Sequence, residues 1–238
     1  MDYAFFDRAK YLGDPDFFNV PQELLISKQY AKDISTKIKN KEELHKIKIT
    51  VSESEETTHF SIVDKWGNAV SNTYTLNTAY GSGIVPTGTG ILMNNEMDDF
   101  SSKPGYPNVY GLIGSEANKI EPKKTPLSSM TPVIVFKEDR PFLVTGSPGG
   151  STIITAVLQE LLNVLDFNMS LSESSKKSKI HFQHLPDIVF YEKLDDETLK
   201  SLKTKKRMLQ RKLGEIHSIL VDENNICLLY TSDAADEF

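Results

Sequence analysis

The segment that most constrains the fold is an apolar run at residues 152–165. Its apolar side chains fall on every side of a helical projection, at Ile153, Ile154, Val157, Leu158, Leu161, Leu162 and Leu165. A helix that is apolar all round needs cover on most of its circumference, so the pattern predicts a helix packed between layers. A layered fold with strands beside this helix is therefore expected.

Two segments show the alternation of strands joined by short turns. Residues 58–64 and 69–75 alternate around the turn 65–68, and residues 132–137 and 141–145 do so across 138–140. Both patterns predict β-hairpins. The spacing of apolar residues predicts helices over 21–38 and over the charged stretch 195–212. Residues 1–20 form an aromatic segment that a turn interrupts.

Composition excludes several classes of protein. The chain has 238 residues and a formal net charge of −6, which argues against a broad nucleic-acid surface. No apolar run approaches the roughly 20 residues of a membrane span. A single cysteine excludes a disulfide framework and a cysteine-rich zinc site within the chain.

The boundary at Glu56-Thr57 is the place in the sequence where a catalytic residue is most clearly indicated. A charged loop without glycine or proline ends there, and a strand headed by two threonines begins. A threonine with a free α-amino group carries nucleophile and base in one residue, but that group exists only if the chain is cut before Thr57. From composition alone, an ordinary strand that starts with a β-branched residue is the main alternative.

The turn at residues 146–151 (GSPGGS) lies between a predicted strand and the apolar helix. Glycines permit close backbone approach, and the amides at a helix start suit an anion, so an oxyanion hole fits. A simple strand-to-helix turn is the alternative. The sequence is neither a P-loop nor a nucleophile elbow.

Residues 94–99 (NNEMDD) and 127–130 (LSSM) together could hold an amino-acid zwitterion. Carboxylates and amides bind an ammonium group, and paired hydroxyls donate to a carboxylate. Each motif alone is weak. The three-residue spacing of His181 and His184 favours packed or surface side chains over a metal site. The basic residues 203–207 are interpreted as a solvated helix face, with an RNA contact as the alternative.

Five motifs in register resemble the γ-glutamyltranspeptidase family, also called glutathione hydrolase, of the N-terminal-nucleophile hydrolases. They are residues 57–61 (TTHFS), 73–77 (TYTLN), 94–100 (NNEMDDF), 126–130 (PLSSM) and 146–151 (GSPGGS). The resemblance extends over residues 1 to about 226. It implies an α+β fold, the four-layer αββα sandwich, incomplete in this chain.

The resemblance implies a mechanism. The precursor would cut itself between Glu56 and Thr57, after which Thr57 attacks a γ-glutamyl amide with its own amine as base. The Thr75 hydroxyl would orient the nucleophile, and the amides of Gly149 and Gly150 would hold the oxyanion. Water, an amino acid or a dipeptide would then release the γ-glutamyl group, with glutathione as the typical donor and with no metal or cofactor.

The resemblance also implies the substrate contacts. Asn77, Glu96 and Asp99 match positions that bind the glutamyl ammonium, and Ser128 and Ser129 match those that bind its carboxylate. Tyr110 matches a lid tyrosine of some bacterial members. Bacterial members of this kind are periplasmic or secreted.

Measured against the family pattern, the chain divides into three parts. Residues 1–56 correspond to the end of the large subunit, and 57–226 to a small subunit that lacks its C-terminal end. Residues 227–238 resemble a translated sequencing adapter, with a genuine acidic tail as the alternative. Most of the large subunit is absent, including an arginine for the substrate carboxylate, so we expect the chain alone to be inactive. Thr152 stands where many members have arginine.

Two other functions remain open on the sequence. One is an acylase of the same fold, similar to cephalosporin acylases, which glutathione and an acyl β-lactam would distinguish. The other is an amino-acid-binding homologue that is never cleaved.

Overall fold

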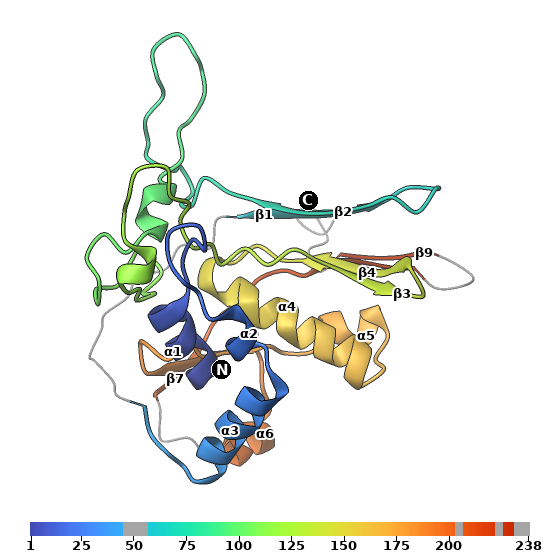
Figure 1. Cartoon of the computed structure of the whole chain (residues 1–238). Coiled ribbons are helices and arrows are strands. Elements are labelled where there is room, and N and C mark those ends of the chain that lie inside the picture. The colour runs from blue at the N-terminus through green and yellow to red at the C-terminus, as the bar shows by residue number, and fades with distance from the viewer. Residues whose placement is uncertain (45–56, 203–206, 222–225, 231–238) are drawn as a thin grey trace. The chain divides into compact units, whose positions relative to one another are not determined.

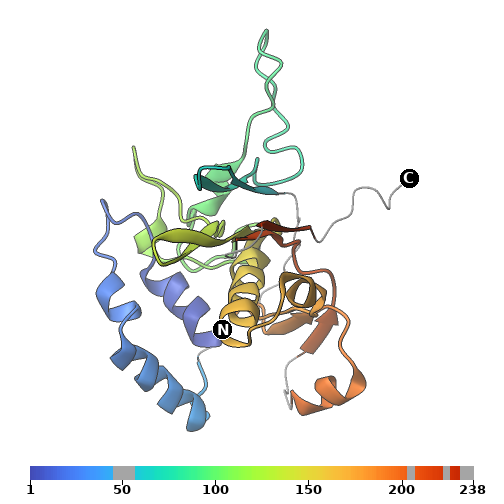
Figure 2. The same cartoon turned by 90° about the vertical axis from the view of Figure 1, so that its right-hand side faces the viewer.

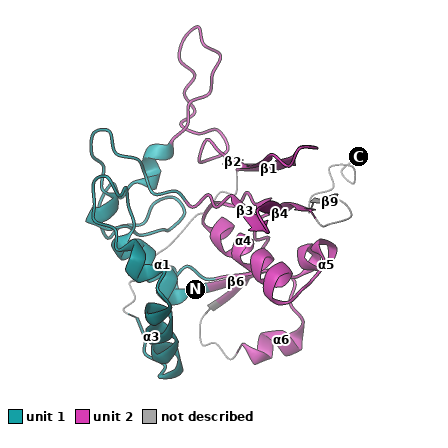
Figure 3. Cartoon of the chain, turned by 45° about the vertical axis from the view of Figure 1, so that its right-hand side comes forward, with its two compact units in different colours: residues 1–53, 96–128, 182–188 teal, residues 54–95, 129–181, 189–238 magenta. Residues whose placement is uncertain are grey.

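The computed structural model describes residues 1–44, 57–202, 207–221 and 226–230 (Figure 1). These residues belong to two compact units (Figure 3). One comprises residues 1–53, 96–128 and 182–188, and the other 54–95, 129–181 and 189–238. They are called the helical unit and the sheet unit below.

The helical unit consists of short helices and irregular loops. Its helices are α1 (Asp2–Tyr11), α2 (Gln22–Leu25), α3 (Lys28–Lys39) and the 3₁₀ helices Glu96–Asp99 and Glu116–Asn118. The helix predicted over 21–38 is present as α2 and α3, because Ser27 starts a new helix by accepting the Tyr30 N–H at 3.1 Å. Helix α1 was not foreseen.

The sheet unit contains the strands. They are β1 (Thr58–Val63), β2 (Ala69–Tyr74), β3 (Val133–Lys137), β4 (Arg140–Gly146), β5 (Ile180–His181), β6 (Ile188–Tyr191), β7 (Arg207–Gln210), β8 (His217–Val221) and β9 (Ile226–Tyr230). Among the described residues, β1 pairs with β2, a second sheet has the order β3-β4-β8-β9, and a third has the order β5-β6-β7. Both predicted hairpins are confirmed.

The layers of the sheet unit are clear in two views. Figures 1 and 2 show the β1–β2 hairpin stacked on the β3-β4-β8-β9 sheet, whose other face carries α4 (Ile153–Leu161). The α4 residues Ile153, Ala156 and Val157 form a buried cluster with Ile216. A π-helical segment (Leu162–Asp166), α5 (Leu171–Lys176) and α6 (Asp196–Ser201) follow along the chain.

The prediction that this apolar helix packs between layers holds in part: α4 packs on the β3-β4-β8-β9 sheet, and its Thr155 Oγ1 lies 2.8 Å from His181 Nδ1 on β5. Leu158 is 43% exposed and Leu162 is 38% exposed. Leu161 is partly buried against the cluster, so only part of the circumference of this helix is exposed.

The β1–β2 hairpin has an unusual distribution of side chains. The face toward the second sheet is polar, and two of its hydroxyls bond that sheet: Ser61 Oγ donates to the His217 carbonyl at 3.1 Å and Ser71 Oγ to the Thr145 carbonyl at 2.8 Å. The opposite face is apolar, with Ile62 51% and Val70 46% exposed. An antiparallel sheet normally buries its apolar face, so the hairpin shows the reverse of the usual pattern.

The helix predicted over 195–212 is wrong in its second half. Helix α6 ends at Ser201, and residues from Arg207 form β7 beside β6. Strand pairing overrides the helical propensity of these residues. Most of the basic face predicted at 203–207 lies outside the described residues.

Strand β9 includes part of the segment that resembles a sequencing adapter. It pairs antiparallel with β8, while residues 231–238 lie outside the described part. An open strand edge accepts an apolar extended segment of any origin, so the origin of residues 227–238 stays a prediction.

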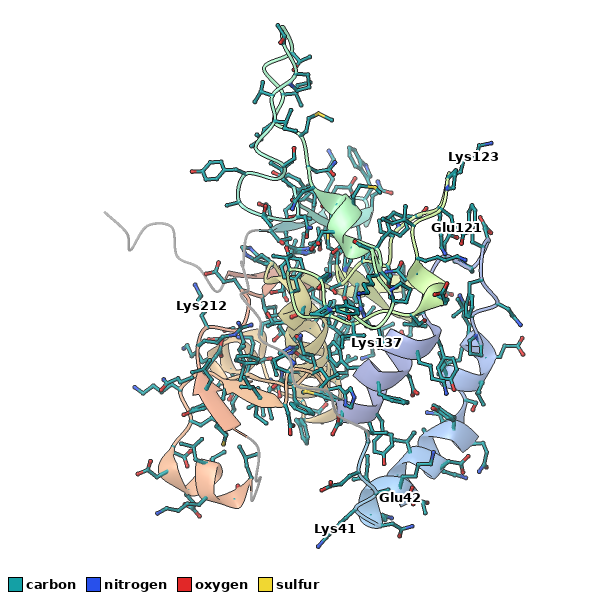
Figure 4. All side chains as sticks on the ribbon, turned by 90° about the vertical axis from the view of Figure 1, so that its left-hand side faces the viewer. Lys41, Glu42, Glu121, Lys123, Lys137 and Lys212 are labelled. Carbon is teal, nitrogen blue, oxygen red and sulfur yellow. The ribbon has the colours of Figure 1, made fainter. Side chains whose placement is uncertain are left out.

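Figure 4 shows Lys41 and Lys123 extending away from the ribbon. Within the described ranges, no helix has both the length and the apolar character that crossing a membrane would demand.

Candidate active site

Thr57 and Thr75 lie opposite each other at the open end of the β1–β2 hairpin. The antiparallel register pairs Thr58 with Tyr74, so the next positions outward are Thr57 and Thr75. Thr57 Oγ1 donates to Thr75 Oγ1 at 3.4 Å, and Thr75 Oγ1 accepts the Asn77 N–H at 2.9 Å. The structure therefore brings together a nucleophile candidate, a hydroxyl that orients it and Asn77.

Asn77 occupies a turn that directly follows this pair. Its φ of 78° lies in the left-handed region, which asparagine tolerates better than most residues. The residue is 2% exposed, and its Nδ2 donates to the Asn95 carbonyl at 3.2 Å. This contact ties the hairpin to the segment that leads into Glu96.

The glycine turn after β4 is buried and has a fixed peptide orientation. Gly149 and Gly150 have φ values of 129° and 56°, a region that favours glycine. Thr152 Oγ1 donates to the Gly149 carbonyl at 2.7 Å. A trans peptide points its carbonyl and its N–H in opposite directions, so the Gly150 N–H points away from Thr152. Thr152 thus orients the Gly150 N–H, which the sequence analysis predicts to be an oxyanion donor.

In the helical unit, Glu96 and Asp99 lie on one 3₁₀ helix, and the ionisation of each carboxyl group affects that of the other. Burial, and next the nearby charge of Glu96, raise the pKa of Asp99 to about 7. Burial also raises the pKa of Glu96. A cationic ligand would offset the repulsion between these carboxylates and favour their charged forms.

Arg8 lies beside this acidic pair and was missed by the sequence analysis. Its Nη2 donates to the Ser128 carbonyl at 3.4 Å. Desolvation lowers its pKa to about 10, and the charge of Asp99 opposes that shift. Arg8 comes from α1, far from Asp99 in sequence, so no local motif could reveal the contact.

The two serines fall in different units. Ser128 is an exposed residue of the helical unit, and Ser129, in the sheet unit, accepts a hydrogen bond from Thr131 Oγ1 on its carbonyl at 2.9 Å. Their roles toward a carboxylate stay predictions.

Tyr110 lies in the interior of the helical unit. It is 5% exposed, and its carbonyl accepts a hydrogen bond from Gln183 Nε2 at 2.9 Å. The lid role that the resemblance implies stays a prediction. Glu56, the other residue of the predicted cleavage site, lies outside the described residues.

The two histidines are packed, as the sequence favoured. His181 is fully buried beside Thr155 Oγ1 at 2.8 Å, and His184 Nδ1 lies 2.6 Å from Asp2 Oδ1. Over the described ranges, no group of three histidine, cysteine or acidic side chains could hold a metal ion.

The helical unit also has an apolar cavity of about 430 Å³, lined in part by Phe5, Phe6 and Leu112. Arg8 lines it, but none of the residues that the sequence predicts for catalysis or substrate binding does. Its apolar walls suit neither a zwitterion nor acyl transfer.

Comparisons with known proteins agree with this chemistry. The family model described as gamma-glutamyltranspeptidase matches residues 1–237. The glutathione hydrolase proenzyme of Escherichia coli (strain K12) is 51% identical over 227 residues, which cover 92% of this chain and 39% of that protein. The chain thus spans about two fifths of this curated relative.

Solved structures show the same relationship. A mutant of Helicobacter pylori gamma-glutamyltranspeptidase aligns with a TM-score of 0.69 and 47% identity, covering 74% of this chain and 98% of that chain. A cephalosporin acylase from Bacillus halodurans aligns with a TM-score of 0.72 over 94% of this chain, at 23% identity, which shows the fold alone. The predicted fold, that of the N-terminal-nucleophile hydrolases, is confirmed.

Proposed function

Because the chain belongs to the γ-glutamyltranspeptidase family, we propose that it is the catalytic part of an enzyme that hydrolyses glutathione and other γ-glutamyl amides and transfers their γ-glutamyl group. The observation that supports this most directly is the hydrogen bond from Thr57 to Thr75 at the start of β1. It gives the expected nucleophile a defined partner.

The reaction begins with maturation. Cleavage of the Glu56–Thr57 peptide frees the Thr57 α-amine, which then takes the proton from Thr57 Oγ1 as that oxygen attacks the γ-carbonyl carbon. The amides of Gly149 and Gly150 stabilise the oxyanion. The Thr57 ammonium returns the proton to the leaving amine, so that a γ-glutamyl ester on Thr57 remains. Water or the amine of an amino acid or dipeptide then attacks that ester.

Recognition of the glutamyl head group falls to a second set of residues. Glu96, Asp99 and Asn77 bind the ammonium, and Ser128 and Ser129 bind the carboxylate. The raised pKa of Asp99 supports this role, since a buried carboxylate near neutrality gains most from a cationic ligand. Tyr110 covers the bound substrate.

Two other functions remain as alternatives. The acylase neighbour supports an amidase of the same fold with another acyl group. Relative rates on glutathione and an acyl β-lactam separate the two, because only a γ-glutamyl donor presents a zwitterion to Glu96 and Asp99. An amino-acid-binding homologue without processing would keep the Glu56–Thr57 bond intact.

The decisive experiment uses the full-length proenzyme that contains this sequence. Intact mass and N-terminal sequencing should find a new N-terminus at Thr57, and γ-glutamyl-p-nitroanilide should be hydrolysed. Thr57→Ala should abolish both, with a loss of activity of about a thousandfold or more.

Thr57→Ser is the matched control, because it keeps a hydroxyl and an α-amine and should retain cleavage. A folded parent proenzyme that stays intact, or cleavage that survives in Thr57→Ala, would refute the assignment of the nucleophile.

A further inference from the structure

Asn118 joins two segments of the helical unit that the proposed function assigns to opposite ends of the substrate head group. It lies at the end of the 3₁₀ helix Glu116–Asn118 and is 4% exposed. Its Nδ2 donates to the Asp99 carbonyl at 2.7 Å, and its Oδ1 accepts the Leu127 N–H at 3.0 Å. One side-chain amide thus links the backbone of Asp99 to the residue before Ser128.

The orientation of this amide is determined by its partners. A carbonyl can only accept and an N–H can only donate, so the nitrogen must face Asp99 and the oxygen must face Leu127. Leucine has a similar shape but makes neither bond. Ionised aspartate still accepts from Leu127 but has no proton for the Asp99 carbonyl. Only a short amide satisfies both groups.

The backbone of Asn118 is anchored as well. Its carbonyl accepts the Ser101 N–H at 2.8 Å, and its N–H donates to the Ser115 carbonyl at 3.1 Å. Because the residue is held from both its backbone and its side chain, the link it makes is rigid.

Such a link matters for a zwitterion. The ammonium and the carboxylate of an amino acid sit on one carbon, so their spacing is constant. Asp99 and Ser128 are distant in sequence, and their relative position depends on contacts such as that of Asn118. If Asp99 and Ser128 are displaced relative to each other, the substrate ammonium or its carboxylate can still bind, but the two cannot bind at the same time.

We propose that Asn118 is a positioning residue that sets the spacing between the ammonium-binding Asp99 segment and the carboxylate-binding Ser128 segment. The proposal rests on the proposed function. Asn118 acts through the two backbone segments and does not touch the substrate.

The test compares Asn118→Leu with Ser115→Ala in the full-length proenzyme. Ser115 Oγ accepts the Ala117 N–H at 3.3 Å and donates to the Lys10 carbonyl at 2.9 Å, so its loss loosens the same 3₁₀ helix without removing the Asp99–Leu127 link. Asn118→Leu should raise KM for γ-glutamyl-p-nitroanilide about tenfold and change kcat by less than about threefold. Ser115→Ala should leave KM unchanged.

Two substrate analogues supply a signature that simple destabilisation would not produce. Glutaryl-p-nitroanilide lacks the ammonium, and 4-aminobutyryl-p-nitroanilide lacks the carboxylate. Each analogue needs only one of the two segments, so Asn118→Leu should change kcat/KM for either by less than about twofold. An equal loss on all three substrates would overturn the proposal.

Asn118→Asp keeps the proposal testable if Asn118→Leu does not fold. It retains the bond from Leu127, and it should show the same pattern with a smaller rise in KM. Hydrogen exchange in the unmodified proenzyme needs no variant: the Leu127 amide should be protected, and exchange at the rate of an unbonded loop amide would refute the link.

The two proposals fail in different ways. A parent proenzyme without γ-glutamyl hydrolysis would refute the proposed function. An active parent whose Asn118→Leu variant has an unchanged KM would refute the role of Asn118 alone.

Discussion

At the residue scale, the candidate site combines residues that local motifs reveal with residues that only the fold brings near. Thr57, Thr75 and the two glycines follow from their motifs, because each stands beside a strand end or a turn that its own neighbours form. Arg8 bonds Ser128, 120 residues away, and Asn118 joins Asp99 and Leu127, which belong to two separate motifs. No periodicity or spacing could find them.

Asp99 gives a prediction about pH. Its pKa of about 7 in the fold exceeds the ordinary value of 3.8, so the folded chain binds more protons than the unfolded chain between these values. The contribution of Asp99 to the free energy of unfolding should therefore fall as the pH rises from about 4 to about 7. Asp99→Asn should reduce that fall, measured by urea denaturation of the chain at both ends of this range.

Glu160 also has a raised pKa and stays in both proteins, so the comparison reports the Glu96–Asp99 pair and not Glu160. An identical pH dependence for the parent chain and Asp99→Asn would contradict the prediction.

At the element scale, turn chemistry and alternation were sufficient to predict the two hairpins and the glycine turn before α4. The sequence failed where tertiary contacts decide the structure. Helix α1 has no regular apolar stripe, and β7 forms from a helix-like sequence because β6 offers it a pairing edge. Which residues of α4 are exposed depends on how the helix packs against the strands, and a local sequence pattern carries no information about that packing.

The contact between the β1–β2 hairpin and β4 yields a second prediction. A Cβ added at Gly146 would lie 2.1 Å from His59 Cε1, and His59 is 4% exposed. Gly146→Ala should therefore destabilise the chain by about 1–3 kcal/mol. Urea denaturation would measure this loss.

His59→Ala supplies the control, because it removes the ring that the new methyl group would meet. The cost of Gly146→Ala should be smaller in that background, which a double-mutant cycle would show as a coupling energy. Additive effects would mean that the close approach does not limit the packing.

At the scale of the whole molecule, the chain spans about two fifths of a curated relative that it matches closely. Of the four layers that the family resemblance implies, the sheet unit shows three, namely α4, the β3-β4-β8-β9 sheet and the β1–β2 hairpin, whose outer face is apolar. A family resemblance predicted this architecture, whereas the hydrophobic pattern alone predicted only layers.

The whole chain should be inactive by itself. We expect no Thr57-dependent release of p-nitroaniline from γ-glutamyl-p-nitroanilide by the purified 238-residue chain, because it spans only about two fifths of that relative. Activity that disappears in Thr57→Ala would contradict this expectation. Circular dichroism would confirm that both chains are folded.

The surface turn between β1 and β2 governs how the catalytic threonines align. Asp64 Oδ1 accepts the N–H groups of Trp66 and Asn68, each at 2.9 Å, and this turn sets the register. One added residue there that shifts the register would turn every side chain of one strand to the other face and move the Thr75 hydroxyl away from Thr57. Trp66 is 76% exposed, so its side chain is free to vary, whereas Asp64 is fixed by these bonds and Gly67 by its positive φ of 88°. The number of residues in this turn, by contrast, is constrained, because it determines whether Thr57 and Thr75 lie opposite each other.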